Sequence, residues 1–326
     1  MKKYLKYKKK YLGLKTEIVD ENGYKYVGDI NFDGMKHGHG IEYFPDGKIK
    51  YEGNWELNKY HGPGTEYIYT DGELTTYQGS YENGVIQGEG NIVYSDGFKY
   101  TGSIKDKIKD GYGIEYYPDG KIQYEGQWKD NKFHGIGTEY MYNGNGKCII
   151  YRGSYENGQM SGRGDLIYPD GMKYTGEWKE SMFHGNGILT YKDQRHYYIG
   201  SWINSHKHGK GIEILEDTTR YEGVWLTSYP HGSGEVIYSN GDRYIGEWKE
   251  GFRSGKGIYY FKDGNKIEAV FIDDKPEKLI LHYPDGTQLM GEVNKFEFTF
   301  NTFKLFVKDT KIEIMRAPIF GDYVIA

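Results

Sequence analysis

The sequence predicts an all-β protein, an elongated and twisted single-layer antiparallel β-meander with a short N-terminal helix and a β-rich C-terminal cap. Two observations carry this prediction. One motif recurs every 23 to 27 residues between Tyr26 and Tyr260, and each copy is too short to bury an apolar face alone. Within each copy, aromatic residues or glycine alternate with polar residues, the pattern of a strand with one apolar face. Together they indicate a solenoid of about ten β-hairpins.

Each copy reads Tyr-x-Gly-x-Trp, a short polar gap, His-Gly-x-Gly, a tyrosine and Asp-Gly. All six tryptophans of the chain fall in the Trp position, where the other copies have Ile or Tyr. Such a column predicts a ladder of cross-strand contacts, each contributing roughly 0.2–1 kcal/mol. The ten copies begin at Tyr26, Tyr51, Tyr77, Tyr100, Tyr124, Tyr151, Tyr174, Tyr198, Tyr221 and Tyr244.

The copy that begins at Tyr124 shows how one unit forms a hairpin. Polar residues separate Tyr124, Gly126 and Trp128, so this stretch predicts the first strand. Residues 137–142 are rich in Thr and Tyr and predict the returning strand. An Asp-Gly or Asn-Gly pair then supplies the positive φ of a tight turn. Such pairs begin at Asp46, Asp71, Asp96, Asp119, Asn143, Asp170, Asn240, Asp263 and Asp285.

Glycine fills three positions in every copy, those of Gly28, Gly38 and Gly40 in the first. Because glycine weakens a strand, each position needs a structural reason. We expect the first to leave room for an aromatic ring of a neighbouring strand over bare backbone. The pair in His-Gly-x-Gly is expected to supply loop dihedrals that other residues resist, and a close approach between units.

This pattern resembles the MORN repeat family (membrane occupation and recognition nexus) over about residues 16–286. The resemblance implies twisted single-layer sheets, protein-binding scaffolds and homodimers joined end to end. MORN arrays also occur fused to methyltransferase or lipid-kinase domains. The structural repeat columns are represented by Tyr51, Gly53, Trp55, His61, Gly62, Gly64, Tyr124, Gly126, Trp128, His134, Gly135 and Gly137.

Both ends depart from the repeat, as the end units of a solenoid do. Residues 17–24 predict a returning strand and turn without a first partner. Beyond Gly286 apolar residues alternate, which predicts strands that cap the last hairpin. We therefore expect three parts: 1–15, a basic helix or tail; 16–286, the repeat array; and 287–326, a capping segment. The alternating apolar residues of the cap are Phe296, Phe298, Phe300, Phe303, Leu305, Val307, Ile312 and Ile314.

The N-terminal 15 residues are a candidate contact for lipid or a partner. Tyr4, Tyr7, Tyr11 and Leu14 form one stripe of a short helix, with lysines elsewhere. Such a basic amphipathic helix binds anionic membranes or docks on proteins; the alternative is a solvated helix or one packed on the first sheet. The segment also resembles Lys-Tyr-Leu-rich starts of proteins from large DNA viruses. The candidate contact residues are Lys2, Lys3, Lys6, Lys8, Lys9 and Lys10.

Charge and cysteine content restrict the class of protein. The net charge is −5; residues 1–15 carry seven lysines and no acid, so the rest sums to −12. An acidic body argues against nucleic-acid binding. The single cysteine, Cys148, fits a reducing compartment, and no apolar run approaches the ~20 residues of a membrane helix. We expect a soluble protein of the cytoplasm.

No catalytic or metal-binding constellation is predicted, and no cofactor. Six histidines recur in the repeat, but each lies in its own unit, about 10 Å from the next at the ~4.8 Å strand spacing, and four units lack one. A metal needs several ligands within about 2.3 Å, so we expect these histidines to hydrogen-bond their loops. Calcium-loop spacing, a phosphate-binding Gly-rich loop and a Gly-x-Ser-x-Gly elbow are all absent from the sequence. The histidines are His37, His61, His134, His184, His208 and His231.

These observations favour a non-enzymatic scaffold that binds proteins, itself included as a homodimer. The first alternative is a peripheral module for anionic membranes that uses the basic N-terminus. The second alternative is a regulatory partner of a separate enzyme chain, because the roughly 40 residues after position 286 are too few for an enzyme domain.

Overall fold

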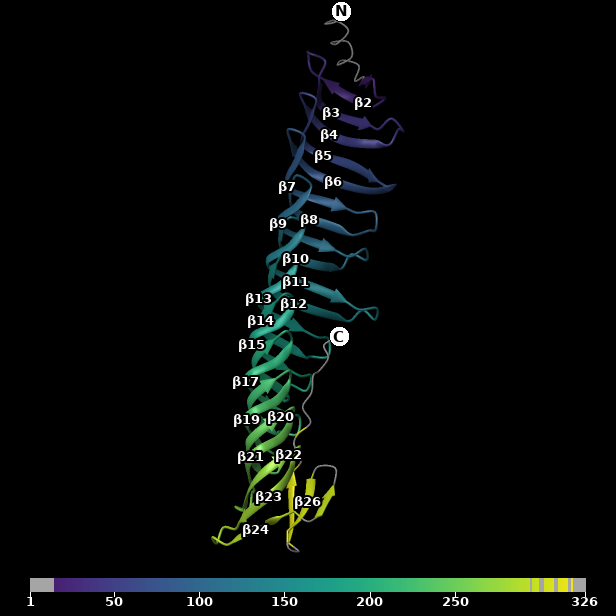
Figure 1. The fold of residues 1–326 in the computed structure, drawn as a ribbon. Helices are drawn as coiled ribbons and strands as arrows, with labels where there is room; N and C mark the ends of the chain where they lie inside the picture. The colour runs from purple at the N-terminus through teal and green to yellow at the C-terminus, as the bar shows by residue number, and fades with distance from the viewer. Residues whose placement is uncertain (1–14, 294, 299–301, 308–309, 316–317, 319–326) are drawn as a thin grey trace, which may run out of the picture. The chain divides into compact units, whose positions relative to one another are not determined.

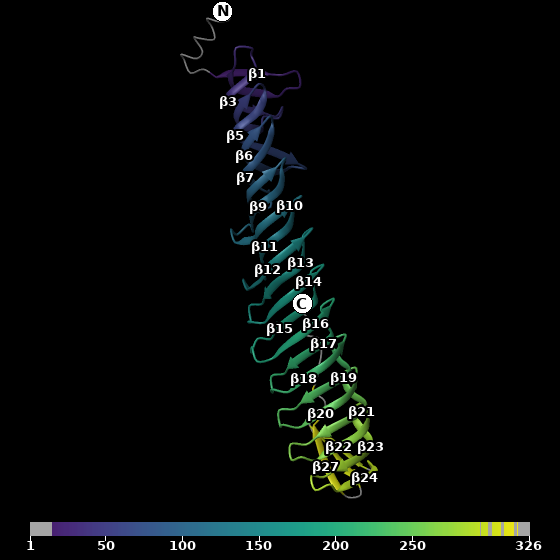
Figure 2. The same cartoon turned by 90° about the vertical axis from the view of Figure 1, so that its left-hand side faces the viewer.

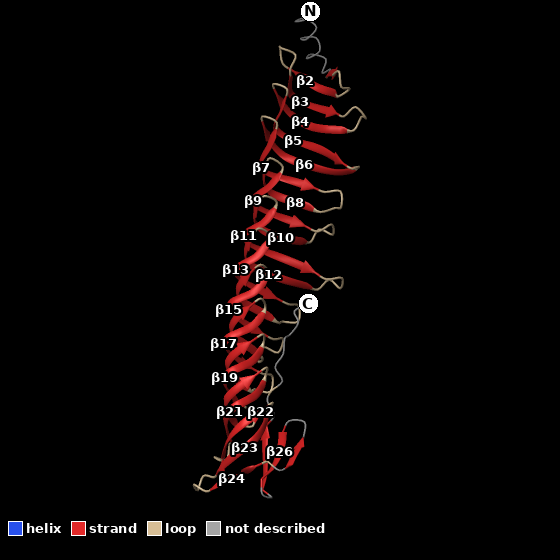
Figure 3. Ribbon diagram, in the orientation of Figure 1, coloured by secondary structure: helices blue, strands red, loops and turns tan. Residues whose placement is uncertain are grey.

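The computed structural model of the chain describes residues 15–293, 295–298, 302–307, 310–315 and 318. The predicted N-terminal helix lies outside these residues. Every regular element of the described part is a strand, as Figure 3 shows, so none of it is a helix able to span a membrane. Strands β1 to β24 belong to one open 24-stranded antiparallel sheet, and β25 to β27 form a second sheet. The predicted all-β meander is confirmed.

The chain divides into two compact units. Unit 1 comprises residues 1–141 and 154–158, and unit 2 comprises 142–153 and 159–326. In unit 1 each strand pairs with the next along the chain (Figure 1). Its strands are β1 (Thr16–Val19), β2 (Lys25–Ile30), β3 (Lys36–Tyr43), β4 (Ile49–Glu56), β5 (Lys59–Thr70), β6 (Glu73–Glu82), β7 (Val85–Val93), β8 (Lys99–Lys105), β9 (Ile108–Tyr116), β10 (Ile122–Lys129) and β11 (Lys132–Tyr142).

Unit 2 repeats the same antiparallel order, visible from a second side in Figure 2. Strand β12 (Cys148–Glu156) has residues in both units, and β11 ends at Tyr142, which belongs to unit 2. The other strands of the large sheet in unit 2 are β13 (Gln159–Ile167), β14 (Lys173–Lys179), β15 (Met182–Thr190), β16 (Tyr197–Ile203), β17 (His206–Ile214), β18 (Arg220–Leu226), β19 (Tyr229–Ile237), β20 (Arg243–Lys249), β21 (Phe252–Tyr260), β22 (Lys266–Ile272), β23 (Lys275–His282) and β24 (Gln288–Glu292).

Two kinds of turn alternate along the sheet. After the first copy, whose turn is longer, the polar gap of the motif is a two-residue turn. Its residues, such as Asp130 and Asn131, both have positive φ (49° and 63°), as in a type I′ hairpin. The returning strand therefore starts at Lys132, five residues earlier than the sequence predicted. The Asp-Gly pairs close the other turns with positive φ at glycine. At Asn143-Gly144 that prediction was wrong, because Gly146 has the positive φ (74°) instead.

In nine of the ten copies the motif tyrosine covers the glycines of its own hairpin; in the copy that begins at Tyr77, Gly79 and Gly90 contact Ile86 and Ile104 instead. We call the face with the motif tyrosines and tryptophans the inner face, and the opposite one the outer face. Tyr124 is fully buried, and its Oη donates a hydrogen bond to the carbonyl of Gln127 at 2.9 Å. A Cβ on Gly126 would lie 2.6 Å from that Oη, and one on Gly137 closer still. The expected ring of a neighbouring strand is thus the ring of the same strand, two residues earlier.

These glycines pair with one another across the strands, and we call the row they form the glycine ladder. Gly126 faces Gly137 on one side and Gly113 on the other. The remaining glycine position, between His and the ladder, has positive φ, 58° at Gly135. There the returning strand carries two residues, Gly135 and Ile136, that have no partner on the first strand, which is a β-bulge. The bulge explains why this position is always glycine.

Tryptophan contacts link a copy of the motif to the preceding copy. The Nε1 of Trp128 donates a hydrogen bond to the ladder carbonyl of Gly113 at 3.2 Å. Its ring meets Tyr100 and Tyr124 edge-on, with centroids 5.4 and 5.2 Å apart. Such edge-to-face pairs add about 0.5–1.5 kcal/mol each beyond burial. The same hydrogen bond recurs at Trp55, Trp178, Trp202, Trp225 and Trp248.

The C-terminal part of unit 2 changes in two ways. Strands β22 to β24 continue the meander with Ile267, Ala269 and Phe271 in place of Tyr, Gly and Trp. Then β25 (Lys295–Phe298), β26 (Thr302–Val307) and β27 (Thr310–Met315) form a small sheet beside the last strands of the large one (Figure 1). The backbone N–H of Met315 donates to Tyr259 Oη at 3.0 Å, which fixes β27 to the inner face at β21. The division at residue 286 stays a prediction.

We predict that Gly126→Ala destabilises the protein by about 1–3 kcal/mol, the usual cost of forcing an extra methyl group into a packed site. The added Cβ would lie 2.6 Å from Tyr124 Oη and 2.7 Å from the carbonyl oxygen of Ile136. Gly144→Ala is the control, since nothing lies within 4 Å of its added Cβ. Urea unfolding followed by tryptophan fluorescence measures both. Equal midpoints for the two variants would contradict the steric role of the ladder.

Candidate functional site

The inner face holds one position whose residue type varies from one copy of the motif to the next. We call it the stacking position: the residue immediately before the His of the motif. Where it is aromatic, its ring stacks on the motif tyrosine of the same unit. The centroid distances are 3.7 Å for Tyr60 on Tyr51, 3.8 Å for Phe133 on Tyr124 and 3.7 Å for Phe183 on Tyr174.

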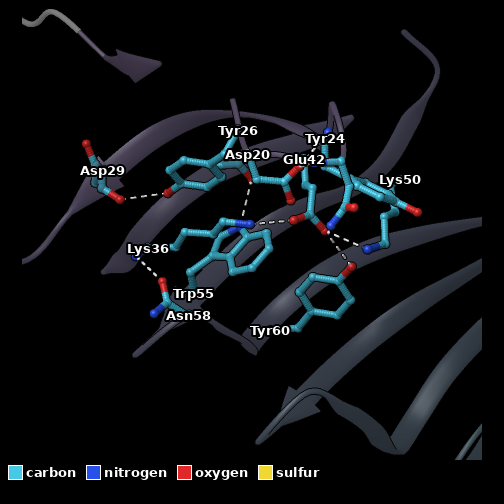
Figure 4. Close-up of polar contacts among 12 residues, drawn as sticks. Asp20, Tyr24, Tyr26, Asp29, Lys36, Glu42, Lys50, Trp55, Asn58 and Tyr60 are labelled. Carbon is cyan, nitrogen blue, oxygen red and sulfur yellow. Dashed lines mark hydrogen bonds and ion pairs between the residues drawn. The ribbon is translucent and has the colours of Figure 1, made fainter. Parts of the chain in front are cut away.

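In four other copies of the motif the stacking position holds a cation. Lys36 is the example drawn in Figure 4: its Nζ lies 5.3 Å from the ring centroid of Tyr26 and 4.7 Å from that of Trp55. Rings at this distance attract a cation through their negative faces. The Nζ also forms an ion pair with Glu42. The other three cations are Lys109, Lys207 and Arg253.

Glu42 is the centre of the cluster in Figure 4. Its carboxylate contacts Lys36, Lys50 Nζ at 3.2 Å and Tyr60 Oη at 3.1 Å. Burial raises the pKa of this carboxyl, but the hydrogen bond and charge of Lys36, with those of Lys50, outweigh burial and lower the pKa below its ordinary value. Burial and the charge of Asp29 raise the pKa of Tyr26 to about 12. The cluster therefore holds its carboxylate ionised and its phenols neutral.

The same lysine–glutamate pair recurs in unit 2, where both side chains are more deeply buried. Lys207 pairs with Glu213, and their side chains are 4% and 2% exposed. His196 Nε2 lies 3.3 Å from the same carboxylate. The Lys207 Nζ is 5.2 Å from the Tyr198 ring and 5.0 Å from the Trp225 ring. In unit 1, Lys109 and Glu115 repeat this pair.

Arg253 is the last of the buried cations and has a different partner. Its side chain is fully buried, and Nε donates to Asp274 of the following hairpin at 2.9 Å. Nearby, Tyr259 donates to Asp242 at 2.6 Å. The guanidinium lies 5.5 Å from the Tyr244 ring centroid. This ion pair therefore joins two successive hairpins, whereas the pairs formed by Lys36, Lys109 and Lys207 with the glutamate six residues later each lie within one copy of the motif.

Glu139 is the residue equivalent to Glu42 in the copy of the motif that has Phe133 at its stacking position. No lysine pairs with it in the described chain; Tyr155 Oη donates to it at 2.8 Å. Burial raises the pKa of this carboxyl, and the tyrosine lowers it only in part. The pKa of the carboxyl in this position is thus lowered in Glu42, beside a stacking lysine, and raised in Glu139, beside a stacking phenylalanine.

Sequence reasoning missed these buried charges, although a signal existed. Lysine stands just before the His position and glutamate six residues later at 36 and 42, at 109 and 115, and at 207 and 213. In a strand an even separation keeps two side chains on one face. A charged pair repeated on the aromatic face would have predicted buried ion pairs.

The structural repeat residues expected from the sequence lie as follows. Both tyrosines, Tyr51 and Tyr124, are fully buried on the inner face, and Trp55 and Trp128 are 4% exposed. Gly62 and Gly135 have positive φ, and the other four glycines belong to the ladder: Gly53, Gly64, Gly126 and Gly137.

The recurring histidines do not converge. His61 is exposed, with Nδ1 3.4 Å from Glu56, and His134 is half-buried. Within the described residues, no three His, Cys, Asp or Glu side chains lie close enough to hold a metal ion. The N-terminal lysines proposed as contacts, Lys2 to Lys10, lie outside the described residues.

The outer face carries grooves along the glycine ladder. Two rows of side chains flank the ladder. The first outer row contains the residue between Tyr and Gly of each motif, together with its cross-strand partners. The second outer row contains the residue between Gly and Trp of each motif, together with its cross-strand partners. In unit 1 the first row is polar over β5–β8, with Thr65, Gln78, Asn91 and Thr101. In unit 2 it is rich in isoleucine: Ile188, Ile199, Ile212, Ile245, Ile258 and Ile280.

This fold and its inner face define a β-hairpin repeat protein with a few buried charged groups among aromatic rings. The MORN repeat family matches ten segments that together cover more than half of the chain, and the chain belongs to that family. Membership indicates a repeat-based interaction module, a class that is generally not enzymatic. The matched segments are 32–49, 51–73, 77–98, 100–122, 124–146, 151–173, 174–194, 198–220, 221–243 and 244–266.

Relatives and solved structures resemble the chain only distantly. Alsin from Rattus norvegicus and Alsin from Homo sapiens are each 29% identical over 105 residues, which is 30% of this chain but only 6% of Alsin. The SAS-4 (dCPAP) TCP domain of Drosophila melanogaster, in complex with a proline-rich motif of Ana2, is 12% identical with a TM-score of 0.29, over 47% of this chain and 88% of that one. The TCP10 domain of Danio rerio CPAP is 13% identical with a TM-score of 0.23, over 77% and 98%.

We predict that Glu213→Leu alone destabilises the protein by about 3–5 kcal/mol, because it leaves the buried Lys207 without its counter-charge. Adding Lys207→Phe should restore most of that loss. The double variant copies the neighbouring unit, which has Phe183 and Leu189 at the same two positions. Urea unfolding measures the three proteins. A double variant as unstable as the single one would contradict the uncompensated-charge explanation.

Proposed function

We propose that this chain is a non-enzymatic scaffold that binds proteins through the outer face of unit 2, with a second copy of itself as a partner. The observation that carries the proposal is the exposed apolar first outer row. Ile188, Ile199 and Ile245 are 40%, 44% and 40% exposed, and Met290 is 59% exposed. Glu222, Glu235 and Glu268 divide the row into shorter apolar runs, such as Ile188 beside Ile199. Exposed apolar side chains grouped on adjacent strands are typical of protein-binding sites.

The groove over β21–β24 is the part of this face best suited to a protein partner. It has a volume of about 680 Å³, and Ile258, Val270, Ile280 and Met290 provide its apolar walls. Its charged lining residues cancel, since two are lysines and two are glutamates: Lys256, Lys278, Glu268 and Glu292.

A second copy is expected to bind at this neutral groove, because the negative charge on the rest of each chain repels another copy elsewhere. Residues 16–326 sum to a net charge of −12, which opposes association of two copies over most of their surface. Approach through a neutral apolar groove avoids that repulsion and removes the exposed Met290 and Val270 side chains from water.

The buried chemistry supports a role without catalysis. Lys207, Glu213 and Arg253 are enclosed by rings and paired with one another or with Asp274, so they stabilise the sheet rather than face a substrate. The single cysteine supports a reducing compartment, and we propose the cytoplasm.

We predict that the chain self-associates across roughly 1–100 μM in sedimentation velocity, the range of weak to moderate affinities. The double variant Ile280→Lys/Met290→Lys should weaken association by at least about tenfold, since each buried apolar side chain contributes about 1.5–3 kcal/mol. The control is Tyr112→Lys/Ile136→Lys, which changes two exposed residues of unit 1 (58% and 65%) by the same charge. A wild-type chain that stays monomeric throughout would contradict self-association.

A second candidate function, recognition of anionic membranes, is favoured by the seven lysines of residues 1–15. Each lysine near an anionic surface adds about 1 kcal/mol to binding. The acidic remainder of the chain opposes that attraction, so binding would depend on the N-terminal segment.

For this second candidate we predict that the full chain sediments with phosphatidylserine-containing vesicles and that deletion of residues 1–15 abolishes the effect. The control is Lys256→Gln/Lys278→Gln, which lowers the positive charge of the repeat body and should leave sedimentation unchanged. Binding that survives the deletion would contradict a lipid role for the N-terminus.

A further inference from the structure

We propose that the lysine-rich segment 1–14 docks in the outer groove of unit 1 of the same molecule. This groove lies over the glycine ladder between β3 and β7, and its lining includes His39, Glu52, Pro63, Gln78 and Glu89. The proposal depends on the charge of the groove, on the place where the described chain begins, and on the length of the segment.

The groove is acidic where its counterpart in unit 2 is not. In the two outer rows of strands β2–β8 the charged residues are Asp29, Glu52 and Glu89, and no lysine or arginine occurs. In unit 2 the second outer row has both signs of charge, because the cations Arg163, Lys210, Lys256 and Lys278 share it with Glu177, Glu247 and Glu292. A basic segment therefore meets acidic charge without competing cations only in unit 1.

The two glutamates of the groove have unused hydrogen-bonding capacity. Among the described residues, Glu52 is half-buried and has neither a hydrogen bond nor an ion pair. Glu89 accepts one hydrogen bond, from Ser103 Oγ to Oε1 at 2.8 Å. Both carboxylates remain able to accept lysine ammonium groups.

The described chain begins at the end of this groove. Lys15 Nζ lies 3.9 Å from Asp29 Oδ2 and donates to the carbonyl of His39 at 3.5 Å. His39 itself lines the groove. The first described lysine thus already occupies the outer face beside the groove, and the six lysines before it follow directly in sequence.

The segment is long enough to reach both glutamates. Fourteen residues span at most about 45–50 Å when extended. The distance from β1 to β7 across six strand steps is about 29 Å at the ~4.8 Å spacing. The segment is tied to the sheet at Lys15, so its effective concentration at its own groove exceeds that at a second copy.

The apolar residues of the segment also match the groove. The floor includes Gly53, Gly64 and Gly79, which have no side chains; Gly53 is buried, and Gly64 and Gly79 are partly exposed. On the inner face Tyr51 covers Gly53 and Gly64, and in the proposed docking the tyrosines at 4, 7 and 11 would supply similar rings to the outer face. Asn54 and Gln78 provide amide partners for their hydroxyl groups.

Zero-length carbodiimide cross-linking tests the docking, because it joins only amines and carboxylates in direct contact. A mixture of unlabelled and ¹⁵N-labelled full chain is cross-linked at low salt and analysed by mass spectrometry. We expect bonds from the lysines at 2–10 to Glu52 or Glu89 within one isotopic species. Their absence, or their occurrence only between the two species, would overturn the proposal.

Limited trypsin cleavage of the full chain provides a second readout that does not need the carboxylates as cross-linking sites. Cleavage after the lysines at 2–10 should accelerate at least about threefold in Glu52→Gln/Glu89→Gln, as expected for the loss of two exposed ion pairs. It should accelerate equally in wild type at about 1 M salt, where such pairs are screened. The control Glu82→Gln/Glu156→Gln removes two exposed carboxylates at strand ends and should match wild type. Equal cleavage rates in all three proteins would overturn the proposal.

Discussion

The position of the motif tyrosine over two glycines is the constraint on which the rest of the structure depends. A ring such as that of Tyr124 can lie flat on its own hairpin only because Gly126 and Gly137 have no Cβ beneath it. The ring then presents its edge and upper face to the next residues in the stack, which are Trp128 and Phe133. The glycine ladder, the tryptophan hydrogen bonds and the stacking position all follow from this placement. A sheet with so few aliphatic residues is stabilised by rings in contact with backbone.

The stacking position shows how such a face tolerates charge. A flat ring accepts another ring, as in Phe183 on Tyr174, or a cation, as in Lys207 over Tyr198. A buried cation needs a counter-charge, and the glutamate six residues later is on the same face of the same strand. Glu139 shows the cost when the cation is absent, because its carboxyl has a raised pKa. The residues that vary between copies of the motif are thus limited by the need to pair buried charges, while the geometry of the inner face stays the same.

The period of the motif was sufficient to predict the antiparallel meander, because hairpins of this size can bury their apolar face only against one another. It could not identify which ring covers the ladder, since the two candidates, the ring of the same strand and that of its neighbour, differ only in side-chain rotamer. The early start of the returning strand at Lys132 escaped prediction because residues with positive φ in the gap, such as Asp130, are not glycine. The outer face was unpredictable for another reason: its residues vary freely, and only the pairing register shows which of them are neighbours.

The enclosure of charge within single units has a consequence for how such genes can change. Because Lys109 with Glu115, and Lys207 with Glu213, are encoded within one copy of the motif, gain or loss of that whole copy leaves neither lysine without its partner. A partial deletion separates them and leaves a lone ion among aromatic rings. Two buried ions have partners in other copies: Arg253 pairs with Asp274 of the next hairpin, and Glu66 pairs with Lys107, two copies further along. Copies that share such a pair are inherited together, whereas a copy whose buried charges are paired internally can be gained or lost by itself.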